Sequence, residues 1–132
     1  MKNVITIIAC ILILAIFMVQ IVANVTTHTK ILAAETEITA AVQTAKQDGC
    51  FTTENINNLK AKLAEKLKCE ESEITVDIDK TTTTPVYRGE LVEYSITYPV
   101  KGVVGAAGVL GISNNTAIRT MSGASASEYV GN

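Results

Sequence analysis

Three cysteines carry the most distinctive side-chain chemistry in this 132-residue chain. Cys10 lies in a continuous apolar run, whereas Cys50 and Cys69 lie in the polar part, at the two ends of the segment FTTENINNLKAKLAEKLK. This segment holds no histidine and no further thiol, so the spacing argues against a zinc site. If the polar part is exported, we expect a Cys50–Cys69 disulfide, which would close a loop of about 20 residues and contribute roughly 3 kcal/mol in the chain-entropy model. The alternative is two ordinary reduced cysteines.

The other reactive side chains do not form a catalytic pattern. His28 is the only histidine and stands among threonines, while Asp77 and Asp79 alternate with apolar residues, as solvated side chains of a strand would. The acidic turn at residues 70–73 lacks the spacing of a calcium-binding loop. The chain contains no G-x-S-x-G, H-E-x-x-H or phosphate-loop motif. We therefore expect no enzymatic activity, no cofactor and no bound metal.

The net charge and the distribution of charged residues indicate which kinds of partner this chain could bind. The formal net charge is −2 and charged residues make up 18% of the chain. A nucleic-acid-binding domain would carry a basic patch, and a membrane-surface protein would carry a polybasic segment. Neither is present, so we expect no nucleic-acid partner, and no pattern indicates a small-molecule substrate.

The N-terminal apolar run matches the thickness of a membrane. Residues 4–25 carry no charge, and as a helix they would extend about 33 Å, close to the hydrocarbon thickness of a bilayer. A cleavable signal peptide has a shorter apolar stretch and small residues at its cleavage site. Here Ala23 is preceded two positions earlier by Ile21, which is a poor match. A membrane anchor or a buried helix is therefore favoured over a removed signal.

The helical pattern continues beyond the apolar run. No Gly or Pro occurs between residues 30 and 48, and apolar residues there recur three and four positions apart, opposite charged ones. These features predict one helix over residues 4–48, stopped by Gly49. The β-branched segment VTTHT at 25–29 is its weakest part, and we expect a kink or local melting there. We divide the chain into an apolar helix, 1–29, and a globular domain, 30–132.

A second, amphipathic helix is predicted after Cys50. Thr52 is a good N-cap with Asn55 three residues later, and the pattern ends near Lys68. One face of each helix is apolar and should pack against a sheet. The residues assigned to this helix-to-sheet packing are Ile31, Ile38, Val42, Ile56, Leu59, Leu63 and Leu67.

The remaining segments predict a small antiparallel sheet. EITVDID alternates apolar and polar residues, VYRGELVEYSITYPV suggests two strand pieces on either side of residues 88–89, and NTAIRTMSG suggests a last strand. Pro99 indicates an edge or a strand end. The connections are too short for helical crossovers, so the strands should be antiparallel and the fold class α+β. Between the last strands, KGVVGAAGVLGIS is either a flexible hairpin loop or an exposed apolar loop that contacts neighbouring subunits or lipid.

This layout resembles type IV pilin-like proteins, in particular the small Tad-type (TadE-like) pilins and pseudopilins of Gram-positive bacteria. The resemblance covers the order of elements along the whole chain. The segments that resemble these proteins most are GCFTTENINNLKAKLAEKLKC before a strand, RGELVEYSITYPV and the C-terminal SEYV. One departure is that the first acidic residue is Glu35, whereas these pilins carry a Glu a few residues into the mature helix, after a leader that ends in Gly.

The resemblance implies a structural subunit of an extracellular filament, inserted in the cytoplasmic membrane before assembly, with its C-terminal domain outside. Its partners would be copies of itself and the pilus assembly machinery. An all-round apolar helix must be covered by lipid or by other helices, which agrees with this expectation. The residues assigned to the filament core are Val4, Ile8, Ile11, Leu12, Leu14, Phe17, Val19, Ile21 and Val22. The alternatives are a membrane-anchored minor pseudopilin or assembly component of a secretion or conjugation system, and a secreted binding domain without its signal.

Overall fold

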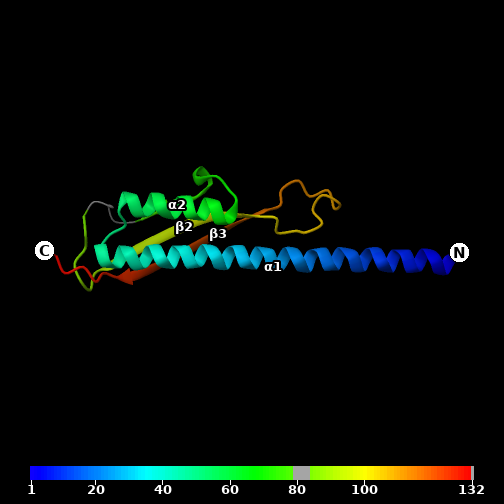
Figure 1. Ribbon diagram of the computed structural model, residues 1–132, viewed down its shortest axis with the longest axis horizontal. Coiled ribbons are helices and arrows are strands. Elements are labelled where there is room, and N and C mark those ends of the chain that lie inside the picture. Colours follow the sequence, from blue (N-terminus) through cyan, green and yellow to red (C-terminus); the bar gives the residue numbers. More distant parts are fainter. Residues whose placement is uncertain (79–83, 132) are drawn as a thin grey trace.

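A computed structural model describes residues 1–78 and 84–131 of the chain. The elements follow in the order α1 (Lys2–Asp48), α2 (Thr53–Leu67), the 3-10 turn η1 (Glu71–Glu73), β1 (Thr75–Asp77), β2 (Leu91–Lys101) and β3 (Thr116–Ala126). Asp79, one of the carboxylates considered above, lies outside the described residues. The N-terminal part of α1 projects beyond the rest of the molecule, the second helix and the sheet lie beside its C-terminal half, and the loop between β2 and β3 reaches along part of its N-terminal half (Figure 1).

Helix α1 is a single run of 47 residues and ends, as predicted, at Gly49, whose φ of 77° is the left-handed conformation that glycine adopts most easily. A side chain at this position would also meet the Val86 carbonyl oxygen at 2.7 Å. Local melting, one of the two outcomes expected at residues 25–29, does not occur, since the helix continues through them. The hydroxyls of Thr26 and Thr29 donate to carbonyl oxygens one turn earlier, so their polar groups are satisfied within the helix.

Helix α2 begins and ends close to the predicted positions. The Thr52 hydroxyl accepts a hydrogen bond of 3.1 Å from the Asn55 N–H, which caps the first turn. The Asn55 amide in turn donates to the Ala41 carbonyl oxygen of α1 at 3.0 Å, so the cap also joins the two helices. Lys68 follows the last turn in a left-handed conformation. The two helices therefore form a hairpin.

The sheet has three antiparallel strands in the order β1-β2-β3. Of the two strand pieces expected around residues 88–89, only the second forms, because residues 86–90 make a turn with Gly89 at a φ of 94°. Pro99 lies within the central strand β2, yet β1 pairs only as far as Thr97. At Pro99 the strand is therefore an edge on that side, which is where a residue without an N–H is tolerated.

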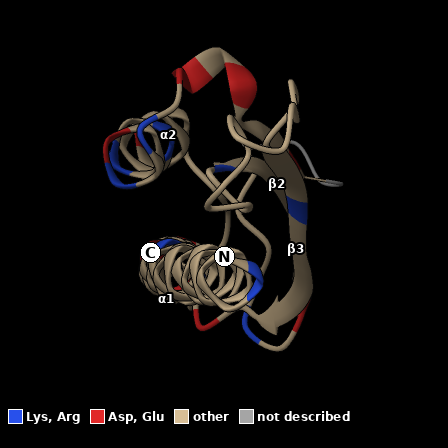
Figure 2. Ribbon diagram, turned by 90° about the vertical axis from the view of Figure 1, so that its right-hand side faces the viewer, with Lys and Arg blue, Asp and Glu red and all other residues tan. Residues whose placement is uncertain are grey.

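The molecule has two layers, with both helices on one face of the sheet (Figure 2). The α+β class predicted from the sequence is confirmed. The core between the layers contains Phe51 and Tyr98 among smaller aliphatic residues, all nearly inaccessible to solvent. In α1 the buried residues are Ala34, Ile38, Ala41, Val42 and Ala45, all in its C-terminal part.

The C-terminal segment SEYV is bonded to the C-terminal end of α1. The Glu128 N–H donates to the Lys46 carbonyl oxygen at 2.8 Å, and the two side chains form an ion pair at 3.0 Å. Ser127 is buried, and its hydroxyl donates to the Val86 carbonyl oxygen at 2.8 Å. These bonds satisfy a carbonyl group of the last helical turn and hold the 86–90 turn beside it.

Candidate functional site

The most distinctive surface of the protein is the apolar N-terminal half of α1. An 18-residue window of this helix has a mean hydropathy of 3.0 and no residue buried inside the molecule. Its large side chains point outward on every side of the helix, so no single stripe faces the domain. The helix is long and apolar enough to cross a membrane, and this length and composition are compatible with insertion into one.

The side chains assigned to a filament core all lie on this surface, and each is between 46% and 65% exposed. They are Val4, Ile8, Ile11, Leu12, Leu14, Phe17, Val19, Ile21 and Val22. So continuous an apolar surface is not stable in water, and it requires lipid or other protein to cover it.

The residues assigned to helix-to-sheet packing lie between the helices and the sheet. Ile38, Val42, Leu59, Leu63 and Leu67 are buried in the core. Ile31 and Ile56 are partly buried and pack against it. The C-terminal half of α1 is therefore the part that fixes the projecting half to the globular domain.

The loop between β2 and β3 folds back onto the apolar half of α1, a contact that the sequence did not reveal. The Gly105 N–H donates to the Gln20 side-chain oxygen at 3.1 Å, and the Gln20 amide donates to the Val103 carbonyl oxygen at 3.3 Å. Gly105 approaches so closely that a Cβ there would lie 2.5 Å from the Val19 carbonyl oxygen. A signal was present in the sequence, because Gln20 is one of few polar residues in the apolar run.

The expected Cys50–Cys69 disulfide is not formed, since Cys10, Cys50 and Cys69 are all free thiols. Cys50 precedes α2 and Cys69 follows it, so the two lie at opposite ends of a 15-residue helix. That helix is about 22 Å long, whereas the Cα atoms of a disulfide lie roughly 5.5–6 Å apart. A bond between them would require α2 to unfold.

The environment of both thiols makes them slow to react. Burial raises the pKa of the Cys50 thiol, and the Asp48 carboxylate raises it further. Burial likewise raises the pKa of Cys69, with a further rise from Glu73. Because the thiolate is the reactive form, a raised pKa lowers reactivity at neutral pH.

We expect mass spectrometry of the folded, non-reduced protein to find no Cys50–Cys69 disulfide. Both thiols should be modified by an alkylating reagent without prior reduction, and Cys50 should react much faster after denaturation in urea than before it, because only 8% of the residue is exposed in the fold. A peptide pair joined through Cys50 and Cys69 in the native protein would contradict this prediction.

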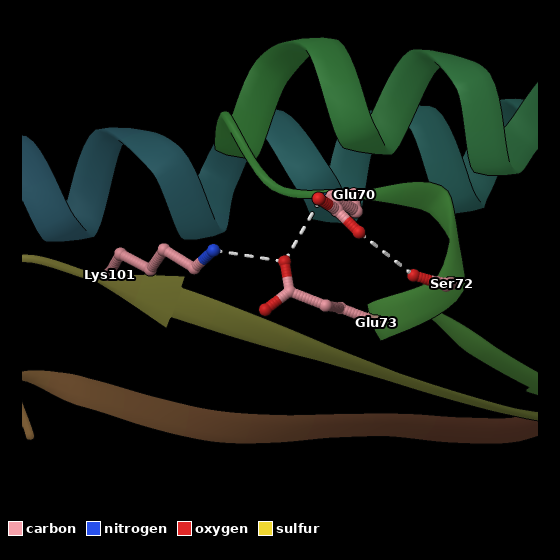
Figure 3. Close-up of polar contacts among 4 residues, drawn as sticks. All are labelled: Glu70, Ser72, Glu73 and Lys101. Carbon is pink, nitrogen blue, oxygen red and sulfur yellow. Dashed lines mark hydrogen bonds and ion pairs between the residues drawn. The ribbon is translucent and has the colours of Figure 1, made fainter.

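A polar cluster joins the η1 turn to the end of β2 (Figure 3). The Glu73 carboxylate accepts a hydrogen bond from the Glu70 N–H and another from the Lys101 ammonium, both at 2.9 Å. The Glu70 N–H bond, followed by the Lys101 bond, lowers the pKa of Glu73, and Glu73 raises the pKa of Lys101. The cluster has the geometry of a capping box and holds the turn in place.

Within residues 1–78 and 84–131, no three His, Cys, Asp or Glu side chains gather closely enough to hold a metal ion. His28 lies on the exposed surface of α1. An open groove between α1 and α2 is lined mainly by small, polar and charged side chains, and these include Glu37 and Lys62, which form an ion pair of 3.5 Å. The described part of the chain therefore offers an apolar assembly or membrane surface as its candidate functional site.

No protein-family model, curated protein or solved structure matches this chain. Its function is therefore inferred from its own geometry and chemistry.

Proposed function

We propose that this protein is a structural subunit of an extracellular type IV pilus-like filament, which polymerises through its N-terminal apolar helix. The observation that carries the proposal is the single helix α1, half of which is apolar on all sides and exposed while the other half is fixed in the core. Because the helix is continuous, its exposed apolar half has a fixed orientation relative to the globular domain.

The physics of identical subunits supports a polymer. When the exposed apolar rods of many copies pack side by side, each rod covers its neighbours and removes apolar surface from water. Contacts that join different surfaces of identical subunits and do not close into a ring generate a helical filament. In this arrangement the globular domains form the outer wall.

The chain would reach this assembly from a membrane. As a helix, residues 4–25 match the thickness of a bilayer. Subunits would therefore be held in the cytoplasmic membrane before assembly, with the C-terminal domain outside. Assembly then exchanges lipid for neighbouring helices around the same side chains, and machinery of the pilus type would drive that exchange.

A second candidate is a single-pass protein that stays in the membrane, such as a minor pseudopilin or an assembly component. The observation that favours it is the same match between apolar length and bilayer thickness, which needs no second copy of the chain.

Shearing intact cells separates the two candidates. We expect the protein to be released by shear in sedimentable fibres that are visible by negative-stain electron microscopy. A protein that stays with the membrane fraction after shear, and that gives only monomers in detergent, would contradict the filament and support the anchored candidate. N-terminal sequencing of the native protein is the matched check: a mature chain that starts beyond Ala23 would contradict both.

A further inference from the structure

We propose that the apolar part of the β2–β3 loop, residues 102–112, enters the lipid beside α1 and is held there by Gln20. The proposal rests on the proposed membrane insertion of α1 and adds a second lipid-contacting element to it. The loop extends from the sheet along the apolar half of α1 (Figure 1).

The loop lies at the depth of the apolar run. Its contact at Val19 is six residues inside the end of that run at Val25, or about 9 Å along the helix axis. If residues 4–25 cross the hydrocarbon layer, the loop at this depth lies within the membrane and not above it.

The charges of the protein define the same boundary. The Lys30 ammonium donates to the Lys101 carbonyl oxygen at 3.0 Å, so α1 and the end of β2 are level there, and Lys101 is paired with Glu73. On the membrane side of this level, α1 carries no charged side chain until Lys2, and the loop carries none before Arg119. Long basic side chains that reach the water at the membrane surface, with no charged side chain below them, fit a membrane boundary.

Exposed apolar side chains occupy the far part of the loop. Val109 is 82% exposed, Leu110 is 55% exposed and Ile112 is 38% exposed. Val109 is the least covered of the three, and together they form an apolar surface that is unfavourable in water.

The loop satisfies part of its own backbone, which lowers the cost of placing it in lipid. The N–H groups of Ala107, Val109, Leu110 and Ile112 donate to carbonyl oxygens three to five residues earlier. Each unsatisfied backbone group costs several kcal/mol in hydrocarbon, so each of these internal bonds lowers the cost of bringing the loop into contact with lipid.

Two side chains satisfy the base of the loop. The Asn115 side chain accepts from the Val104 N–H at 2.6 Å and donates to the Val104 carbonyl oxygen at 2.7 Å. Gln20 does the same for Gly105 and Val103 from the helix side. The Gln20 amide is therefore hydrogen-bonded to the loop. This reduces the free-energy cost of placing an amide group in the apolar run.

Tryptophan fluorescence tests the proposal, because the protein contains no tryptophan. The full-length variant Val109→Trp is reconstituted in phosphatidylcholine vesicles with and without brominated acyl chains, which quench a tryptophan that contacts them. Phe17→Trp reports on the helix, and Tyr87→Trp, at an exposed site in the turn before β2, is the water-exposed control. We expect blue-shifted and strongly quenched emission for Val109→Trp and Phe17→Trp, and neither effect for Tyr87→Trp.

Three results would overturn the proposal. Emission of Val109→Trp like that of Tyr87→Trp, with Phe17→Trp quenched, would place the loop in water beside an inserted helix. A blue shift without quenching would mean that protein, such as a second copy, covers the loop. An unquenched Phe17→Trp would refute membrane insertion itself, and the loop proposal with it.

The role of Gln20 has its own variant. Gln20→Leu keeps the helix apolar and removes both hydrogen bonds to the loop. Added to Val109→Trp, it should lower the quenching by brominated lipid, while the same change added to Phe17→Trp should leave quenching unaltered. Unchanged quenching at Val109→Trp would refute Gln20 as the residue that holds the loop.

Discussion

Leu14→Lys is expected to abolish filament assembly while leaving the protein in the membrane. Leu14 lies at the centre of the apolar run and is 62% exposed. The run contains 14 Leu, Ile, Val and Phe residues, counted from 4 to 25. Thirteen of them remain in the variant, and at about −0.3 to −0.6 kcal/mol each for insertion they outweigh the roughly 3 kcal/mol cost of one central lysine, which can also extend toward the membrane surface. Insertion therefore survives the change.

A filament core would not tolerate the same change. There every subunit would bring one ammonium group into a dry bundle of apolar helices, with no carboxylate before Glu35 to pair with it. An unpaired buried charge costs several kcal/mol, and the helical repeat would place like charges near one another. We expect sheared fibres to disappear while the amount of protein in carbonate-washed membranes stays close to that of the wild type.

Ile118→Lys is the matched control for this experiment. Ile118 lies on the outer face of β3 and is 74% exposed, so the same new charge is placed on the globular domain. Fibres and membrane content should both remain. Normal fibres from Leu14→Lys would show that the apolar helix is not the core of the polymer.

The fold was largely predictable because its signals are local. The apolar run and the spaced stripe that follows it predict α1, Gly49 predicts its end, and Thr52 with Asn55 predicts the start of α2. Each signal depends on residues within a few positions of one another. Alternation likewise predicted the last strands, and the short connections between strands predicted an antiparallel sheet.

Two expectations failed locally, at residues 25–29 and in the segment before Arg88, but the other errors concern relations across longer distances. Cys50 and Cys69 are suggestive as a pair, yet the helix between them keeps them apart, and combining the two predictions would have excluded the disulfide. The docking of Gly105 on Gln20 joins positions 85 residues apart, and the polar Gln20 in the apolar run marks one side of this contact without identifying its partner. The sequence did indicate that the glycine-rich loop was apolar, and left open whether lipid or protein contacts it.

Phe51→Ala is expected to destabilise the globular domain by about 3–5 kcal/mol, the usual cost of removing a fully buried phenylalanine. Phe51 has no exposed surface, and its ring lies 6.0 Å from that of Tyr94, centre to centre, where the helix hairpin meets the sheet. With no tryptophan and only two phenylalanines in the chain, the smaller aliphatic residues around it cannot fill the space. A domain of this size has a total stability of about 5–15 kcal/mol, so the loss is a large fraction of it.

The second phenylalanine supplies the control, because Phe17→Ala is the same substitution at a site that is 63% exposed on the projecting helix. Unfolding of the full chain by urea in detergent is monitored by the near-ultraviolet circular dichroism of the tyrosines, which reports on the globular domain. Far-ultraviolet circular dichroism is unsuitable, because the helical signal of the micelle-bound half would obscure the unfolding transition. We expect the midpoint to fall by roughly 2 M for Phe51→Ala and to stay unchanged for Phe17→Ala. Equal shifts for both variants would mean that the apolar half of α1 contributes to the stability of the core, against the separation of roles along α1.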